Sequence, residues 1–536
     1  MDLSNFSLLY PSFDAQKSHM SGSDAPNIDT FELEELGLTE IFEMTNRELC
    51  EFLTCDPEVM AYRIETFSDM LENPGIAKTL NRLMPILGDV MELRRLDSDS
   101  GDDTAYLSSI TEIELYISSI ETLHAGLSEV RPNLKGRALS ALADYIGELV
   151  DSDYYRQLNE KLTELTNRVR EIKSVTVGVN LDAQLRPAEA GVLSINAKPF
   201  HSGDVLEKIL RMNFKDDEYT CIAQLVPFGK KQTENQKTAL SLAFTTAISD
   251  VYKSSLRSWK KIVQTYILEN TEFLLNLMPE IEFIVKGTEL LQALRERGCT
   301  LCRPVIAPVS DKTYRAEGLY NPCVALKSEG EIITNDLVFD ENATIYVLTG
   351  PNRGGKSVIT CALGLSQVMA QLGMFVCADK IELSPVDAIF THFPTGADDT
   401  IDKGRLGEEC DRLRDVFDVI TPRSLILMDE SFSSTGAYEA SYIAAEVLRA
   451  ISYMGCRCIF STHLHQLVTE IEVINEEAER NGYAKIDTLV AGIETGKRSF
   501  KITRQKPDGK SYARDIALKY GISYDSIINN FKEREN

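Results

Sequence analysis

Hydrophobic residues recur at spacings of three and four in the first quarter of the chain, from Phe31 to about Gly126. The clearest run consists of four isoleucines, Ile110, Ile113, Ile117 and Ile120. Apolar residues at this spacing form one face of an α-helix. A second amphipathic run predicts a helix from about Tyr154 to Lys173. This part of the chain is therefore expected to be mainly helical.

The hydrophobic period then changes to two, which is typical of strands, and predicts a small β element from about Val175 to Ile195. Two further helical patterns follow, roughly Asn235 to Leu277 and Ile281 to Arg297. Long helices that flank a small β-containing tip fit this order. An ordinary helical bundle with one irregular loop fits the same periodicity, so both architectures stay open.

From Pro304 onward, strand-like and helical segments alternate to the end of the chain. This alternation is typical of an α/β domain, in which crossover helices connect the strands of a parallel sheet. We therefore place a domain boundary near residue 304. Residues 1–304 form the helical region with its small β element, and residues 305–536 form the α/β domain.

The stretch Thr349–Ser357 has the spacing G-x-x-x-x-G-K-S of a phosphate-binding loop. It follows the apolar run Thr344–Leu348 and precedes a helical pattern from Val358 to Leu372. In such a loop, backbone N–H groups and the helix N-terminus surround phosphate, the lysine reaches the β- and γ-phosphates, and the serine ligates Mg²⁺. The alternative is a glycine-rich turn that has this spacing by chance, but that would explain neither the strand-like run before it nor the helical pattern after it. The expected nucleotide contacts are Gly350, Pro351, Asn352, Arg353, Gly354, Gly355, Lys356, Ser357 and Val358.

A second motif, Ser424–Glu430, is a buried strand that ends in two carboxylates. Ligands of α/β sheets bind at the carboxyl ends of the strands. We expect Asp429 to hold Mg²⁺ through water and Glu430 to act as general base on the attacking water. The alternative is a strand that simply ends in acidic turn residues. A third strand, Arg457–Ser461, leads to His463, which is expected to contact the γ-phosphate.

Composition narrows the class of protein. No apolar run in the 536 residues approaches the length of a membrane span, and the N-terminus lacks a basic region followed by an apolar core, so we expect a cytoplasmic protein. Eleven scattered cysteines suit a reducing compartment. The pair Cys299 and Cys302 has no second pair or histidine nearby, so we expect no zinc site there.

The formal net charge of −26 counts against a generic nucleic-acid coat protein. The region from Lys230 to Lys261 is nevertheless locally basic. Such a run is usually a solvated helix face, and a nucleic-acid contact is the alternative.

Together these motifs resemble the ATPase domain of the MutS family of DNA mismatch-repair proteins. The matching stretches are Thr349–Ser357, Pro385–Thr391, Ala397–Asp399, Met428–Glu430, Ser461–His463 and Lys510–Tyr512. The resemblance covers about residues 310 to 525. It implies a P-loop NTPase domain of the ABC-ATPase kind that uses ATP and Mg²⁺. Its site residues would be Lys356, Glu430 and His463 for catalysis and Ser357 and Asp429 for the metal.

The resemblance also has consequences beyond the phosphate loop. The helical region looks like the family's core and lever arms with a reduced clamp, and Ile333 occupies the position of an adenine contact. The family forms dimers through its ATPase domains, with a loop approaching the partner's γ-phosphate. Here that loop is Lys403–Glu408, where we expect a helix to begin near Glu408 and Arg405 to act as a phosphate clamp.

Three departures from the family pattern bear on function. We expect no mismatch-recognition domain, the Ser-Thr pair of the family's G-R-S-T-F loop is missing from Gly404–Glu408, and Asp429–Gly436 replaces D-E-x-G-R-G-T-S. We therefore expect an ATP-gated DNA-binding dimer that acts on branched or distorted DNA rather than on mismatches. The alternative is an NTPase switch that acts on a protein or a ribonucleoprotein. A transport-type ATPase subunit is disfavoured because a membrane segment and an S-G-G-Q signature are lacking.

Overall fold

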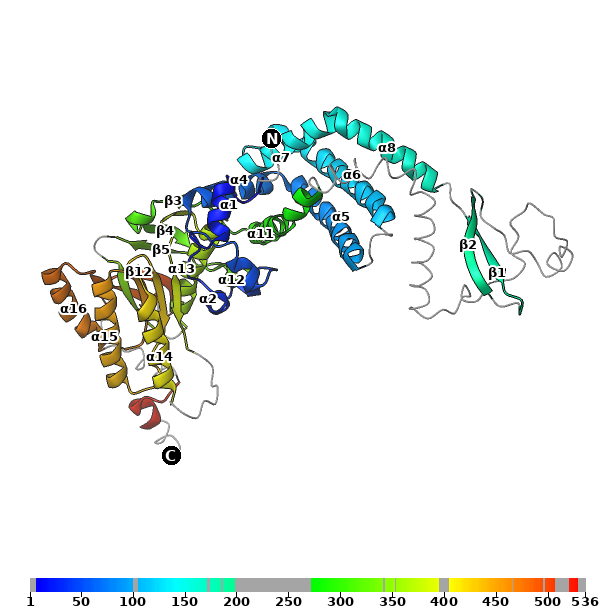
Figure 1. Cartoon of the computed structure of the whole chain (residues 1–536). Coiled ribbons are helices and arrows are strands. Elements are labelled where there is room, and N and C mark those ends of the chain that lie inside the picture. The colour runs from blue at the N-terminus through cyan, green and yellow to red at the C-terminus, as the bar shows by residue number, and fades with distance from the viewer. Residues whose placement is uncertain are drawn as a thin grey trace. The chain divides into compact units, whose positions relative to one another are not determined.

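Two compact units divide the chain in the computed structural model (Figure 1). The first comprises Met1–Phe6, Asn73–Lys135 and Leu139–Glu282, and the second comprises Ser7–Glu72, Gly136–Ala138 and Phe283–Asn536. The structure describes residues 6–99, 105–170, 174–184, 187–196, 198, 271–340, 343–351, 353–394, 404–464, 466–494, 497–506 and 520–528.

The described residues of the first unit form helices and a β-hairpin. Its elements are α5 (Pro74–Asp99), α6 (Ala105–Val130), η3 (Arg131–Asn133), α7 (Arg137–Asp151), α8 (Asp153–Arg170), β1 (Ser174–Leu181) and β2 (Pro187–Asn196). Helices α5 and α6 pack closely, since a Cβ added at Gly126 would lie 2.0 Å from Thr79 Oγ1. The antiparallel strands β1 and β2 form the β element that the sequence predicted.

A six-stranded sheet forms the centre of the second unit, in the order β12-β11-β6-β10-β9-β8. The strands are β6 (Ile345–Thr349), β8 (Ile389–His392), β9 (Leu425–Asp429), β10 (Arg457–Ser461), β11 (Ile486–Glu494) and β12 (Lys497–Arg504). All neighbours are parallel except β11 and β12. The prediction of an α/β part with a parallel sheet is therefore confirmed.

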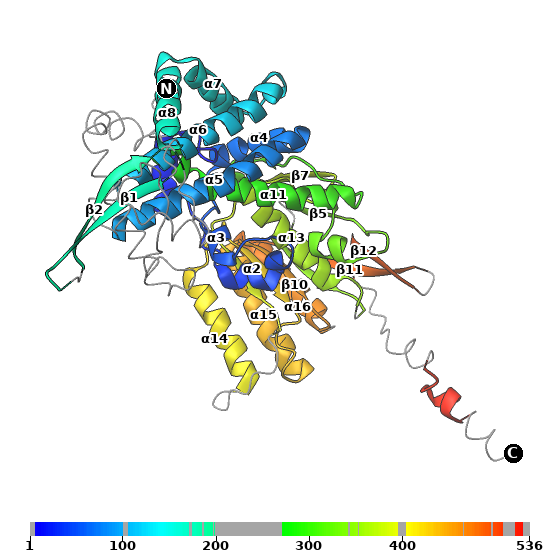
Figure 2. The same ribbon diagram turned by 90° about the vertical axis from the view of Figure 1, so that its right-hand side faces the viewer.

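Helices cover both faces of this sheet. They are α13 (Lys356–Gln371), α14 (Gly404–Val419), α15 (Ala437–Met454) and α16 (Leu467–Asn481). On one face, Ile426 and Met428 of β9 pack in a cluster with residues of α14, α15 and α16, which lie near one another in Figure 2. On the other face, Leu427 packs towards α13, where a Cβ added at Gly364 would lie 2.7 Å from its Cδ1. Burial on both faces explains why β9 reads as one continuous apolar run.

A smaller mixed sheet belongs to the same unit, in the order β3-β7-β4-β5. Its strands and adjoining helices are β3 (Val305–Ile306), η4 (Val309–Asp311), β4 (Tyr314–Leu319), α12 (Pro322–Lys327), β5 (Asn335–Phe339) and β7 (Lys380–Leu383). Tyr314 is completely buried, and its hydroxyl lies 2.7 Å from Ser366 Oγ on α13. This contact fixes the small sheet against the helix that follows the phosphate loop.

The N-terminal segment belongs to the α/β unit, which differs from the expected boundary near residue 304. Its elements are α1 (Phe13–Met20), α2 (Thr30–Leu36), η2 (Leu38–Glu40), α3 (Asn46–Cys50) and α4 (Pro57–Glu72), and α11 (Met278–Glu296) joins the unit from Phe283 on. Leu36 lies against Gly364, and the fully buried Arg63 lies against Gly373. These contacts join residues that are far apart in the chain, so a local sequence pattern cannot predict them.

The start of α14 corrects a second expectation. The helix begins at Gly404, not near Glu408, so Gly404–Glu408 has helical backbone rather than the form of a free loop. Leu406 packs against the same apolar cluster as Leu413, and this contact draws the first turn into the helix. No described helix combines the length and the apolar character needed to cross a membrane.

Candidate functional site

The loop between β6 and α13 has the backbone that a phosphate-binding loop needs. Gly350 and Gly355 have φ of 140° and 95°. A Cβ at Gly350 would lie 2.7 Å from the Cβ of Ala491 on β11, so only glycine fits there. Arg353 also has a positive φ, 59°, which the sequence did not indicate. No side chain caps α13 at Gly355, so its first N–H groups face the loop and suit an anion.

Lys356, the first residue of α13, is only 4% exposed. Its Nζ lies 3.2 Å from the carbonyl oxygen of Gly350 and 3.3 Å from that of Pro351, so the ammonium donates to the loop itself. Burial lowers the pKa of Lys356, while the negative charges of Glu430 and Asp429 oppose the shift. A phosphate would supply the anionic partner that this buried cation favours.

His463 connects the lysine to the predicted general base. Its Nε2 lies 3.2 Å from Lys356 Nζ and 2.8 Å from Glu430 Oε1. We assign the ring proton to Nε2, because a carboxylate can only accept and Lys356 already has carbonyl acceptors. His463 therefore donates to Glu430 and orients that carboxylate. The three residues predicted to be catalytic are thus brought together from α13 and from the ends of β9 and β10.

The two carboxylates at the end of β9 differ in their surroundings. Glu430 has φ of 47°, and its N–H donates to the carbonyl oxygen of Ser461 at 2.9 Å, which turns its half-exposed side chain towards His463. Asp429 is 8% exposed, and burial raises its pKa while a hydrogen bond with the Ser357 side chain opposes the shift. One is placed to act on water, and the other is held close to the phosphate loop.

Asp429 and Ser357 fit a magnesium ion. Asp429 Oδ1 is buried and has no hydrogen-bond partner among the described residues. An orphaned carboxylate oxygen beside a hydroxyl is the donor set that Mg²⁺ uses when phosphate oxygens and water complete its shell. Within the described part of the chain, no group of three His, Cys, Asp or Glu residues forms a metal cluster. The predicted pair is therefore chemically suited to a metal that arrives with a nucleotide.

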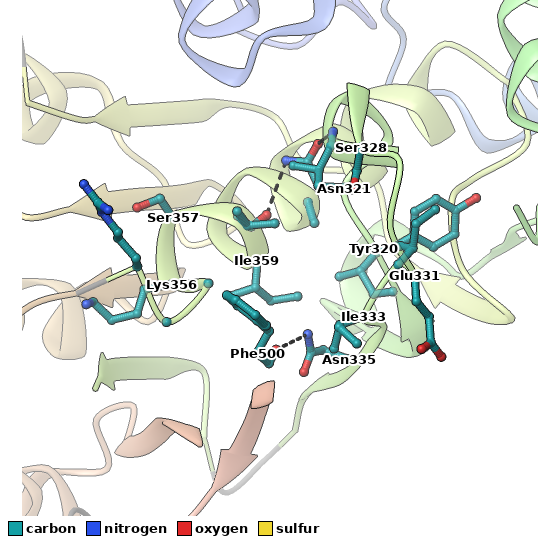
Figure 3. Close-up of a pocket in the computed structure, with 18 of the residues that line it drawn as sticks. Tyr320, Asn321, Ser328, Glu331, Ile333, Asn335, Lys356, Ser357, Ile359 and Phe500 are labelled. Carbon is teal, nitrogen blue, oxygen red and sulfur yellow. Dashed lines mark hydrogen bonds between the residues drawn. The ribbon is translucent and has the colours of Figure 1, made fainter. Parts of the chain in front are cut away.

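A cavity of about 440 Å³ opens beside the loop (Figure 3). The predicted residues that line it are Ile333, Arg353, Gly354, Gly355, Lys356, Ser357, Val358 and Glu430. Ile333 thus shares one cavity with the phosphate loop although β5 and β6 separate them in the chain. Asn352 lies outside the described residues.

The cavity also contains residues that the sequence did not indicate, chiefly Phe500, Asn335 and Tyr320. Phe500 on β12 has φ of 55° and is 44% exposed, and Asn335 Nδ2 donates to its carbonyl oxygen at 3.2 Å. Asn335 Oδ1 accepts from the N–H of Ile502 at 2.7 Å. These bonds hold an aromatic ring at the cavity next to Gly355. A lone aromatic within the polar run Lys497–Lys501 was the only signal in the sequence.

Several predicted residues cannot be compared with the structure. The backbone of Arg405 lies in the first turn of α14, but its side chain lies outside the described residues. The stretches Ala397–Asp399, Lys510–Tyr512 and Lys230–Lys261 also lie outside them.

A buried polar cluster adjoins Glu430 in the chain. His392, at the end of β8, is 2% exposed. Its Nδ1 lies 2.7 Å from Ser431 Oγ, and its Nε2 lies 3.2 Å from the carbonyl oxygen of Glu409 on α14. Because a carbonyl only accepts, Nε2 carries the proton and Nδ1 accepts from the Ser431 hydroxyl. Burial, and then the charge of Arg412, lower the pKa of His392 to about 4, so the ring is neutral at pH 7.

Two protein-family models match the chain. The model described as MutS domain V matches residues 346–525, which include the phosphate loop, both carboxylates and His463. The model described as MutS2 N-terminal domain matches residues 55–297, which include most of the helical unit.

Individual relatives match over part of the chain. The chain is 33% identical over 172 residues to the DNA mismatch repair protein MutS of Lactobacillus delbrueckii subsp. bulgaricus, covering 32% of this chain and 20% of that protein. It is 37% identical over 221 residues to MutS of Chloroflexus aurantiacus, covering 40% and 22%. It is 35% identical over 184 residues to the DNA mismatch repair protein Msh6 of Gallus gallus, covering 32% and 14%. The match thus spans about a fifth or less of the length of these relatives.

Proposed function

Because the chain belongs to the MutS family, we propose that it binds and hydrolyses ATP through a P-loop NTPase domain of the ABC-ATPase kind. The observation that carries the proposal is the contact of Lys356, His463 and Glu430 at the mouth of a nucleotide-sized cavity. If His463 were only a core histidine, or its contact with Glu430 only a structural ion pair, a glycine-rich loop would not be needed beside it. The positive φ of Gly350 and the uncapped start of α13 supply the anion site that the contact would serve.

Each residue has a role that follows from its position. The N–H groups at the start of α13 and the Lys356 ammonium bind the phosphates and neutralise their charge. Ser357 and Asp429 would hold Mg²⁺, which supplies further charge neutralisation on the phosphates. Glu430 accepts a proton from the attacking water, and His463 keeps the carboxylate oriented through the 2.8 Å hydrogen bond.

The base of the nucleotide would lie beside Ile333 and Phe500, in the same cavity as the phosphate loop. Ile333 offers an apolar contact, and Phe500 offers a ring face on which a purine can stack. Asn335 fixes the backbone of Phe500, so the ring is held in place before the ligand binds. This arrangement supports the proposal that Ile333 lies beside the adenine.

Two variants test the proposal because they separate binding from chemistry. Lys356→Ala should weaken ATP binding itself, since it removes a phosphate contact. Glu430→Gln should bind ATP as the unmodified chain does but hydrolyse it about 10² to 10⁴ times more slowly, the usual contribution of a positioned base. Calorimetric titration and phosphate release measure the two quantities. Equal loss of ATP affinity in both variants would contradict these roles.

We also propose that ATP brings two copies together through their α/β units and that Arg405 takes part. Arg405 adds a positive charge in the first turn of α14, a helix end that itself favours anions. Glu430→Gln with ATP should therefore give a dimer by light scattering. Adding Arg405→Ala should return it to the state without nucleotide. A double variant that remains as dimeric as Glu430→Gln alone removes Arg405 from this role.

Branched or distorted DNA is the partner that we propose for this dimer, with contacts in Lys230–Lys261. The net charge of −26 favours a second candidate, an NTPase switch that acts on a protein or a ribonucleoprotein. A gel shift with branched and linear DNA over a salt series separates the two. Reversing Lys230, Lys231, Lys260 and Lys261 to Glu should abolish DNA binding and leave DNA-independent ATPase turnover unchanged. Binding that survives with the same salt slope identifies the region as a solvated helix face.

A further inference from the structure

The turn after Glu430 adopts a conformation that its own sequence does not favour. Glu430 and Phe432 have φ of 47° and 66°, although neither is glycine. Residues with a Cβ rarely adopt this left-handed region unless their surroundings hold them there. The hydrogen bonds within the turn are long, 3.3 Å from Ser433 N–H to the Glu430 carbonyl and 3.4 Å from Thr435 N–H to the Phe432 carbonyl. The turn therefore depends on contacts from outside it.

Glu409 on α14 provides the closest of these contacts. Its Oε2 accepts a hydrogen bond from the N–H of Phe432 at 2.6 Å. A carboxylate that accepts from a backbone N–H makes one of the stronger hydrogen bonds in proteins. The backbone carbonyl of Glu409 accepts from His392, whose other ring nitrogen bonds Ser431. One residue of α14 thus fixes Phe432 directly and Ser431 through a neutral histidine.

Helix α14 is in turn fixed by contacts of its own. Arg412 lies 3.5 Å from the carboxylate of Glu35, and its guanidinium lies 5.0 Å from the centroid of the Phe31 ring. The side chain of Leu413 packs in the same buried cluster as Phe432. Because Glu409 belongs to α14, a displacement of this helix along its axis would withdraw Glu409 from the turn. The phosphate loop and α13 would keep their own hydrogen bonds.

We propose that Glu409 is a positioning residue for hydrolysis, which holds the turn that carries Glu430 and so couples the position of α14 to the rate of ATP cleavage. The proposal rests on the ATPase function proposed above. Among the described residues, those that line the cavity include Glu430 but not Glu409, so Glu409 affects chemistry without touching the nucleotide. Its loss should change kcat and leave nucleotide affinity as it is.

The test compares kcat and ATP affinity in the full chain. Glu409→Ala should lower kcat about ten- to a hundredfold with unchanged ATP affinity, since a misplacement of about 1 Å costs that much. Glu409→Gln keeps an amide oxygen that can accept from Phe432 and should recover most of the rate. Asp415→Ala is the matched control, because Asp415 lies on the same helix, is exposed and pairs with Arg414. It should behave like the unmodified chain.

A double variant distinguishes positioning from general destabilisation. If Glu409 acts through Glu430, adding Glu409→Ala to Glu430→Gln should cause no further loss of kcat, whereas independent effects would multiply. Multiplying losses, or an unchanged kcat in Glu409→Ala, overturn the inference and leave the ATPase proposal intact. Should Glu409→Ala fail to fold, Glu409→Asp, whose carboxylate is one methylene too short to reach the Phe432 N–H, takes its place in the same cycle and is read by the same two outcomes. An unmodified chain without ATPase activity overturns both proposals.

Discussion

The folded α/β unit should lose stability in mild acid through His392. Because its pKa is lowered to about 4, it stays neutral in the folded state at a pH where an unfolded histidine, with its ordinary value of 6.5, binds a proton. The unfolded state then holds more protons, so stability is complete above pH 6.5 and falls as the pH drops towards 4. The loss through this group should reach about 2 kcal/mol by pH 5 and about 3 kcal/mol at pH 4.

The perturbation that isolates this effect is His392→Gln. The amide does not titrate, and its NH₂ group can replace the ring in donating to the Glu409 carbonyl. Other groups titrate equally in both proteins, so they cancel when the two free energies of unfolding are subtracted at each pH. Urea unfolding followed by circular dichroism between pH 7 and pH 4 gives this difference. The unmodified chain should lose about 3 kcal/mol more than the variant over that range.

An equal pH dependence in the two proteins would refute the reasoning, because it would mean that His392 titrates alike in the folded and unfolded states. If the variant instead lost more stability than the unmodified chain, a negative charge next to the ring would have to stabilise the protonated histidine. The nearest described carboxylate partner of the cluster, Glu409, uses Oε2 for the Phe432 N–H and presents its backbone carbonyl to the ring.

Three further outcomes are expected at the cavity beside the phosphate loop. Gly350→Ala should weaken ATP binding about tenfold or more in calorimetric titration, since its Cβ would lie 2.7 Å from that of Ala491 and left-handed strain alone costs about 1–3 kcal/mol. Gly436→Ala, whose added Cβ meets nothing within 4 Å, should bind normally. Phe500→Ala should weaken ATP binding by about 1–3 kcal/mol, because the stacking contact with the base is lost, and should leave tripolyphosphate binding unchanged. An equal loss of affinity for both ligands would exclude stacking. Asp429→Asn should raise the Mg²⁺ concentration that half-maximal hydrolysis needs, whereas ATP binding in EDTA should persist.

The sequence was informative wherever chemistry depends on neighbours in the chain. The glycine spacing of Thr349–Ser357 indicates the loop between β6 and α13, and the apolar run of β9 indicates a buried strand that ends at Asp429, directly before Glu430. The β-hairpin at about 175–195 follows from alternation alone. Local patterns of this kind are strong because one element contains the whole signal.

The rest depended on contacts between distant segments. Phe500 reaches the cavity because β12 pairs with β11 at the edge of the sheet. Glu409 reaches Phe432 because α14 packs against residues of β8 and β9. The start of α14 was predicted too late in the chain because Leu406 packs against hydrophobic residues from other elements, which its own stretch of sequence does not contain. Spacing alone carries no information about such partners, so the phosphate loop was predictable while its supporting residues were not.

The assignment of Ser7–Glu72 to the α/β unit has a consequence for biosynthesis. The carbonyl of Thr54 accepts a hydrogen bond from Gln371, a residue 317 positions later. At about 5–20 residues per second, a ribosome delivers that partner roughly 15 to 60 s after Thr54. During this interval the helical unit, encoded in between, can fold, while Leu33 and Leu36 still await the core that later buries them. Translation therefore sets an order in which the helical unit can fold first and the α/β unit is completed last.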